Sequence, residues 1–110
     1  MGSDYYLTGY VYFIQAGEES AVKIGSTIEH VEKRRLALQT SNHHDLKVIG
    51  LIDIRKESGK NELDRIQYSA LARKRETQIQ SHFEKDKIRG EWFNLSKELR
   101  DYIFKHSNAL

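Results

Sequence analysis

The chain has 110 residues and a formal net charge of +2, with 38% hydrophobic and 31% charged residues. These values are typical of a single globular domain spanning residues 1–110, not of a disordered chain. No apolar run reaches the roughly 18 residues that a membrane-spanning helix needs, so we expect no membrane association. The absence of cysteine excludes disulfides and thiolate metal ligands. Residues 1–4 carry no signal-peptide pattern, so we expect a cytoplasmic protein, or a nuclear one if the source is eukaryotic.

The first part of the chain predicts a β-hairpin. Residues 8–15 are aromatic and β-branched throughout, and residues 21–26 alternate apolar and polar positions. The five residues between these segments include Gly17, which can adopt a positive φ. A connection of this length favours an antiparallel pair of strands.

A helix and a third strand are expected next. The helix should cover about residues 29–40, with Thr27 or a neighbouring residue as its cap, and it places Val31, Arg34 and Leu38 on one face. Residues 46–54 form a nearly continuous apolar run. Such a run is typical of a strand covered on both faces, so we expect it at the centre of the sheet.

The C-terminal half predicts two more helices. A long one should cover roughly residues 61–85 and end at residues 88–90, and Glu76 lies on its apolar stripe. A short extended piece, residues 91–95, precedes a last helix that Ser96 caps and that ends near Lys105. The predicted fold is therefore an α+β (α/β) domain with a small central antiparallel three-stranded sheet flanked by helices. Its order is β-β-α-β-α-(β)-α.

Three polar residues occupy positions where apolar ones are expected, namely Tyr12, Arg34 and Glu76. A tyrosine in a strand can simply pack, and an arginine can extend its head group to solvent. Buried carboxylates are rare unless they are paired or bound to metal. Arginine and glutamate could also form a plain ion pair, and the spacing alone does not exclude this.

Five motifs in order carry a family resemblance. Residues 9–14 (GYVYFI) and 23–27 (KIGST) resemble the paired strands of the GIY-YIG nuclease family. Downstream come Arg34 with residues 38–40 (LQT), then Glu76, then Phe83 and residues 90–93 (GEWF). This set is most similar to a phage and fungal subgroup with the pattern VYFI…VKIG…GEWF. The resemblance covers about residues 8–103.

The resemblance implies a metal-dependent endonuclease that hydrolyses phosphodiester bonds, in DNA more than in RNA, with one Mg²⁺ or Mn²⁺ ion. Tyr12 would activate the attacking water, Arg34 would hold the scissile phosphate and Glu76 would bind the metal. A single glutamate is sufficient, because Mg²⁺ commonly uses one or two carboxylates together with waters and substrate phosphates. The remaining candidates are Lys23 as a catalytic cation and, for substrate binding, Gly25, Ser26, Arg35, Asn94, Arg73 and Lys74.

Two positions depart from the family pattern. Tyr10 stands where the first glycine of GIY would be, which the subgroup tolerates. Lys23 stands where the second tyrosine would be, so an ammonium group replaces a phenol and the usual proton relay is in doubt there. Arg35 is an alternative to Arg34, which we prefer because it lies four residues before Leu38.

Other functions remain open at this stage. The chain could be a nucleic-acid-binding module without turnover, or a structural or partner-binding domain in which the three polar residues form only a buried network. His43 and His44 are adjacent, and adjacent histidines rarely bind one metal, so we expect them at the surface. Because no separate recognition domain is present, a homodimer or a specificity partner would have to supply sequence specificity.

Two structural expectations follow from the nuclease hypothesis. Tyr12, Lys23, Arg34 and Glu76 should converge on one concave face. Burying the Glu76 carboxylate without a counter-charge would cost several kcal/mol, so a cation should meet it, either Arg34, Lys23 or the metal.

Overall fold

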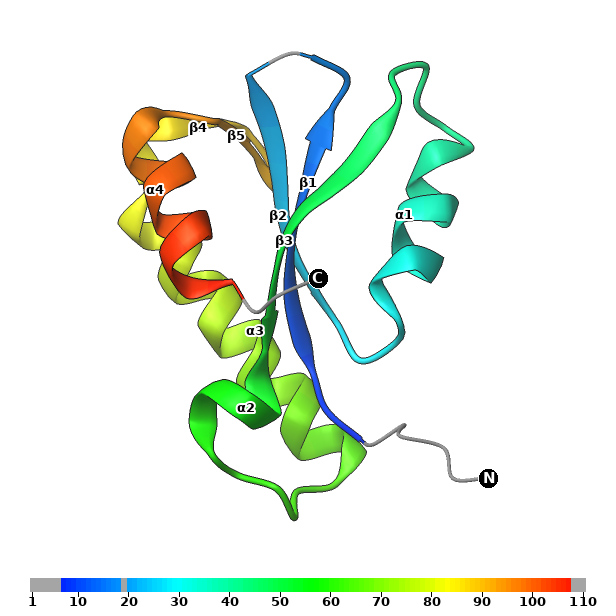
Figure 1. Ribbon diagram of the computed structural model, residues 1–110, viewed down its shortest axis with the longest axis vertical. Coiled ribbons are helices and arrows are strands. Elements are labelled where there is room, and N and C mark those ends of the chain that lie inside the picture. The colour runs from blue at the N-terminus through cyan, green and yellow to red at the C-terminus, as the bar shows by residue number, and fades with distance from the viewer. Residues whose placement is uncertain (1–6, 19, 108–110) are drawn as a thin grey trace.

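The computed structural model describes residues 7–18 and 20–107, so residues 1–4 and Glu19 of the predicted loop lie outside the described part. Within that part, five strands form one antiparallel sheet in the order β3-β1-β2-β5-β4 (Figure 1). This confirms the α+β class and the antiparallel sheet, which is extended by two short strands. The strands are β1 Tyr10–Ala16, β2 Ala21–Thr27, β3 Leu46–Asp53, β4 Lys87–Arg89 and β5 Trp92–Asn94.

The predicted hairpin is confirmed. Strand β1 pairs with β2 in a register that places Tyr12 opposite Gly25. Gly17 has a φ of 60° at the start of the connecting turn, where a residue with a β-carbon would be strained. This register brings Tyr12 and Gly25 together, although they lie thirteen positions apart in the chain.

The helices are α1 Val31–Gln39, α2 Ile54–Ser58, α3 Arg65–His82 and α4 Lys97–His106, and a 3₁₀ turn η1 covers Glu84–Asp86. Helix α1 is capped by His30, whose Nδ1 accepts from the Glu32 amide, and not by Thr27. Helix α3 begins later than predicted because Asp64 and Gln67 form a capping box at its start. The Ser96 cap of α4 is confirmed, since its hydroxyl accepts from the Leu99 amide at 3.2 Å.

Two sequence predictions are wrong. Strand β3 lies at an edge of the sheet, not at its centre, and its apolar run is explained because α1 packs against it from one side and α4 from the other. Residues 88–90 do not end the long helix, which stops at His82. They belong instead to a β4–β5 hairpin, in which Gly90 has a φ of 55°.

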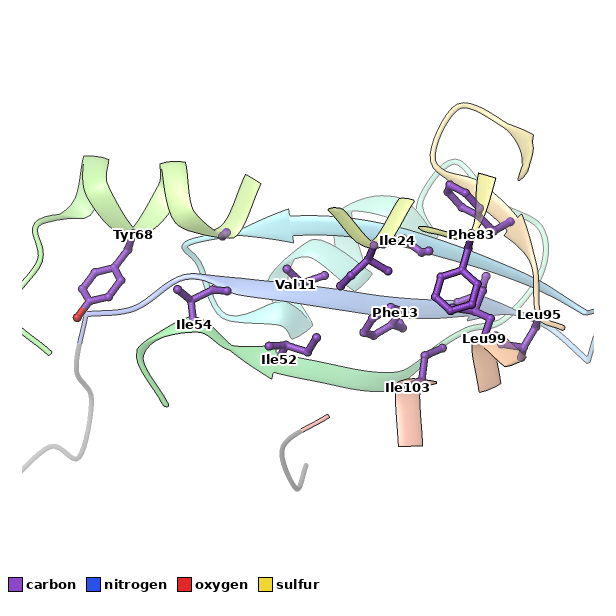
Figure 2. Packing of buried hydrophobic residues seen from close by; sticks show 14 residues of the cluster. Val11, Phe13, Ile24, Ile52, Ile54, Tyr68, Phe83, Leu95, Leu99 and Ile103 are labelled. Atoms are coloured by element: carbon purple, nitrogen blue, oxygen red, sulfur yellow. The ribbon is translucent and has the colours of Figure 1, made fainter. Parts of the chain in front are cut away.

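Apolar clusters cover both faces of the sheet. Val11 and Phe13 of β1 point toward α3 and α4, where they pack with Ile24 and Ile79 in the larger cluster (Figure 2). The alternate residues of β1, which include Tyr12, point toward α1 and form a smaller cluster. The sheet therefore separates α1 from α3 and α4, as Figure 1 shows.

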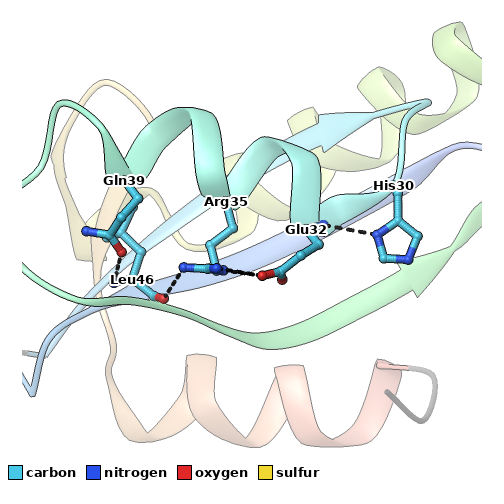
Figure 3. Close-up of polar contacts among 5 residues, drawn as sticks. All are labelled: His30, Glu32, Arg35, Gln39 and Leu46. Carbon is cyan, nitrogen blue, oxygen red and sulfur yellow. Dashed lines mark hydrogen bonds and ion pairs between the residues drawn. The ribbon is translucent and has the colours of Figure 1, made fainter.

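Polar contacts hold α1 against β3 (Figure 3). Arg35 pairs with Glu32 at 2.6 Å, and its Nη1 donates to the Leu46 carbonyl at 3.4 Å. Gln39 accepts from the Leu46 amide at 2.9 Å. These contacts fix the orientation of α1 relative to β3.

None of the helices in the described ranges is long and apolar enough to cross a membrane.

Candidate functional site

The second half of β2, residues 24–27, has an edge that none of the strands in the described part of the chain covers. We call this segment the β2 edge. Strand β5 pairs only with Ala21–Lys23. Beyond that point the Ile24 amide donates to the Glu91 carbonyl at 2.9 Å, and the Ile24 carbonyl accepts from Gln80 Nε2 at 2.9 Å. Helix α3 and the β4–β5 turn therefore both border the β2 edge.

Tyr12 lies directly over Gly25. Tyr12 is 1% exposed, and a β-carbon at position 25 would collide with its hydroxyl group. Only glycine leaves room for the ring at this register position. Gly25 thus allows the Tyr12 ring to lie across β2. This one contact explains why position 12 can hold a tyrosine and why position 25 requires a glycine.

Glu76 is a buried carboxylate in an unfavourable setting. Its residue is 9% exposed, and it accepts a hydrogen bond from Gln80 Nε2 at 2.9 Å. Burial, opposed by a hydrogen bond with Ser26 and reinforced by the neighbouring Glu91 carboxyl, raises the pKa of Glu76 to about 7. Within the described residues, no lysine or arginine forms an ion pair with it. Of the three cations expected to meet this carboxylate, neither Arg34 nor Lys23 forms an ion pair with it, and the metal ion stays a prediction.

Lys23 pairs with a different acid. Its Nζ lies 3.1 Å from Glu91 Oε1 and 5.8 Å from the centre of the Trp92 ring. The lysine side chain is only 14% exposed. Glu91 consequently contacts two groups: it pairs with Lys23, and it raises the pKa of Glu76.

Arg34 reaches the β2 edge from the other side. It lines a pocket of about 320 Å³ together with Ser26, Thr27 and the α3 residues Ala72 and Arg73. Its Nε is buried and has no hydrogen-bond partner in the described part of the chain. A buried guanidinium nitrogen without an acceptor is costly, and an anion in this pocket could satisfy it.

The expectation that Tyr12, Lys23, Arg34 and Glu76 converge on one concave face is wrong, because these residues do not share one face of the sheet. Tyr12 belongs to the face that α1 covers, and Glu76 comes from α3 on the opposite face. They approach the same short segment instead. Tyr12 packs on Gly25, and Arg34 shares a pocket with Ser26. Ser26 also forms a hydrogen bond with Glu76, which lowers the pKa of that carboxyl group.

A family model for the T5orf172 domain matches residues 9–106, nearly the whole chain. The chain belongs to the T5orf172 domain family. This domain is GIY-YIG-related and nuclease-like, which agrees with the broader family indicated by the sequence motifs. No curated protein and no solved structure gave a significant match.

Three of the predicted residues lie apart from the β2 edge of this T5orf172 domain. Lys74 lines a separate pocket with Ile54 and Glu57, while its neighbour Arg73 lines the Arg34 pocket. Asn94 is exposed and pairs with Ala21, at the opposite end of β2 from the edge. Arg35 is held by its contacts with Glu32 and the Leu46 carbonyl.

The structure adds two residues to the site of the T5orf172 domain that sequence reasoning did not select. Gln80 links the Glu76 carboxylate to the Ile24 carbonyl, and Glu91 links Lys23 to Glu76. A sequence signal for Gln80 existed, since it lies one helical turn after Glu76 on the same face. For Glu91 the only signal was its place in the GEWF motif.

The donor set limits the kind of metal that this T5orf172 domain could hold. No group of three or more histidine, cysteine, aspartate or glutamate side chains is assembled among the described residues. His43 and His44 stack on each other at 4.3 Å, and they join no such group. Glu76, with Glu91 beside it, offers one or two carboxylates without histidine or thiolate. Such a set fits Mg²⁺ or Mn²⁺, which prefer oxygen ligands, and does not fit a structural zinc site.

Proposed function

We propose that this chain is a metal-dependent endonuclease that hydrolyses phosphodiester bonds, in DNA more readily than in RNA. The observation that carries the proposal is the Glu76 carboxyl group, which is buried beside a second carboxyl group and has no cation paired with it. Burial raises its pKa to about 7, so the folded protein would gain from a divalent cation at this point. A carboxylate kept in such a setting suits metal binding better than it suits stability.

Arg34 would bind the scissile phosphate. Its unpartnered Nε lies in the pocket that Ser26 and Arg73 also line, and a phosphate oxygen there would accept the missing hydrogen bond. Charge accumulates on the phosphoryl oxygens as the nucleophile attacks. A fixed guanidinium therefore stabilises the transition state more than it stabilises the bound substrate.

Tyr12 would orient and activate the attacking water. The Gly25 contact fixes the phenol over the β2 edge, so the hydroxyl group needs no rearrangement before reaction. Glu76, with Glu91 as neighbour, would hold one Mg²⁺ or Mn²⁺ ion. When bound, the ion would supply positive charge for the phosphate and lower the pKa of a bound water.

A second candidate function is DNA binding without turnover. Lys23 occupies the position of the second family tyrosine, and its ion pair with Glu91 at 3.1 Å keeps the ammonium group beside the site. If that pair persists when substrate binds, Glu91 would be neutralised and the proton relay would be missing. The T5orf172 domain would then hold DNA and leave it intact.

One experiment separates these functions. Purified protein is incubated with supercoiled plasmid DNA in Mn²⁺, in Mg²⁺ and in EDTA, and nicked product is quantified. The nuclease proposal predicts nicking that requires the metal. Salt-sensitive binding without nicking would favour the second function, and neither binding nor nicking would leave only a structural or partner-binding role.

A further inference from the structure

An arginine-lined groove leads away from the candidate active site along α3. The Arg34 pocket shares Ile28, Ser69 and Arg73 with a second pocket of about 330 Å³, which continues to Arg65. The two hollows are therefore parts of one groove between α3 and the segment that joins β2 to α1. We call this feature the arginine groove.

The arginine groove follows the helical repeat of α3. Arg65, Ser69 and Arg73 are spaced by four residues and line one side of the helix, and Glu76 follows three residues after Arg73. Eight residues of α-helix correspond to about 12 Å, which is the length of three to four base-pair steps of B-DNA. The groove thus follows α3 over the length of several nucleotides, and Glu76 lies just beyond its Arg73 end on the same helix.

Charge in the groove favours an anionic ligand. Arg34, Arg65 and Arg73 line it, and none of the three forms an ion pair with another described residue. The groove holds one acid, Glu29, whose carboxylate Lys33 binds at 2.9 Å. Glu29 also interacts electrostatically with Arg65 and Arg34 over a longer distance, so a single acid is shared among several cations and the groove keeps an excess of positive charge.

Arg65 and Ile66 belong to the first turn of α3 and line the outer end of the groove. Arg65 directly follows the N-cap Asp64, whose carboxylate accepts from the Gln67 amide at 2.8 Å and supplies the negative charge that the helix dipole favours there. Arg65 is exposed and Ile66 is 80% exposed, so neither side chain contributes to the core. Both are therefore open to a ligand in the groove.

We propose that the arginine groove binds the phosphate backbone of duplex DNA on one side of the scissile phosphate, with Arg73 and Arg65 as successive phosphate contacts beyond Arg34. The inference rests on the proposed function, because it takes the β2 edge as the place of the scissile phosphate. Backbone contacts of this kind fix the register of the duplex and carry no sequence information. The groove therefore predicts binding with weak sequence preference.

Binding is measured by fluorescence anisotropy with a labelled duplex of about 20 base pairs in EDTA, over a series of salt concentrations. Each phosphate contact contributes about 0.9 to the slope of log K against log salt. Arg65→Ala and Arg73→Ala should each reduce the magnitude of the slope by about 0.9, and the double variant by about 1.8. The control is Arg100→Ala, which removes an exposed arginine of α4 and should leave the slope unchanged.

Equal slopes for the wild type and the double variant would overturn the groove proposal, as would equal losses for the double variant and Arg100→Ala. Melting curves should show all variants folded, since Arg65 and Arg73 are exposed. A nicking assay in Mn²⁺ keeps the two proposals distinguishable. If the double variant loses the expected slope but the wild type does not nick DNA, the groove proposal is supported and the nuclease proposal is rejected. If the wild type nicks DNA but the double variant keeps the wild-type slope, the nuclease proposal is supported and the groove proposal is rejected.

Discussion

Two regions of this small domain, the β3–α2 junction and the β2 edge, each bury a carboxylate, and the two carboxylates differ in their hydrogen-bond donors. Asp53, at the junction of β3 and α2, is 5% exposed and acts as the N-cap of α2. It accepts hydrogen bonds from the Thr8 hydroxyl at 2.7 Å and from the Arg55 and Lys56 amides at 3.0 and 3.4 Å. These donors replace the water that the carboxylate loses on folding, so no ligand is needed to explain it.

Glu76, at the β2 edge, has a less favourable set of neighbours. It has hydrogen bonds with Ser26 and with Gln80, which also serves the Ile24 carbonyl, and the Glu91 carboxyl group beside it opposes its negative charge. Burial consequently raises the pKa of Glu76 to about 7. The comparison shows that burial alone does not mark a functional carboxylate. The neighbouring groups determine whether a buried carboxylate is stabilised by donors within the fold, as Asp53 is, or could be stabilised by a bound cation, as we propose for Glu76.

The proposed chemistry lies at the β2 edge, and Arg34→Ala should strongly reduce its rate. We expect nicking to fall by roughly 10²- to 10³-fold, a size typical for loss of one transition-state donor, with only a modest loss of DNA affinity. Single-turnover nicking and anisotropy measure the two quantities separately. Arg35→Ala is the matched control and should act through its contacts to Glu32 and Leu46 on stability. Equal losses of rate and affinity for Arg34→Ala would make it a docking contact.

The raised pKa of Glu76 predicts a pH-dependent stability. The carboxyl group titrates near its ordinary value of 4.5 in the unfolded chain and at about 7 in the folded one. Between these values the folded state keeps a proton that the unfolded state has released, so wild-type stability should fall as the pH rises. Glu76→Gln cannot lose this proton. Its stability relative to wild type should therefore increase between pH 4.5 and pH 8, by at most about 3 kcal/mol.

Urea unfolding of both proteins at the two pH values gives this difference directly. Glu98→Gln, at an exposed position of α4, is the control and should show no such gain. If the difference in unfolding free energy between Glu76→Gln and wild type stays constant across the pH range, the pKa of Glu76 is not raised, and its carboxylate is as well stabilised by its neighbours as that of Asp53.

Asp53→Ala should act on stability alone. Its removal takes the carboxylate acceptor from the Thr8 hydroxyl and from the first amides of α2, and only the Lys56 amide and the stronger Thr8 contact then lack a replacement of equal quality. We expect a loss of about 2 kcal/mol in the free energy of unfolding. Urea unfolding measures the loss, and nicking is compared well below the melting temperature of the variant. Nicking by the folded variant should match that of the wild type. A large loss of turnover would contradict the assignment of Asp53 to stability alone.

Local sequence patterns predicted the parts of the fold that depend on neighbouring residues. The β1–β2 hairpin, with Gly17 in its turn, and the Ser96 cap are both specified within a few positions. The place of β3 in the sheet was not predictable in this way. Its apolar run indicates cover on two faces, and an edge strand between α1 and α4 satisfies that pattern as well as a central one does.

The sequence predicted which residues belong to the candidate site better than it predicted how these residues are arranged. Motif order selected Tyr12, Arg34 and Glu76, and the structure gathers them around one segment of β2 from two faces of the sheet. Periodicity could not reveal that Lys23 pairs with Glu91, because that contact depends on how the β4–β5 turn meets β2. A basic tripeptide in sequence, residues 73–75, likewise points in different directions once it is wound into α3.

The central claim is that Glu76 is kept uncompensated in order to bind a metal ion, and Glu76→Gln tests it most directly. The substitution preserves the shape of the side chain and the Gln80 contact, and removes the negative charge. Mn²⁺-dependent nicking of supercoiled plasmid is measured for wild type and variant, with melting curves to show that both are folded. The account predicts a folded variant with no metal-dependent nicking. A folded variant that nicks at the wild-type rate would contradict it.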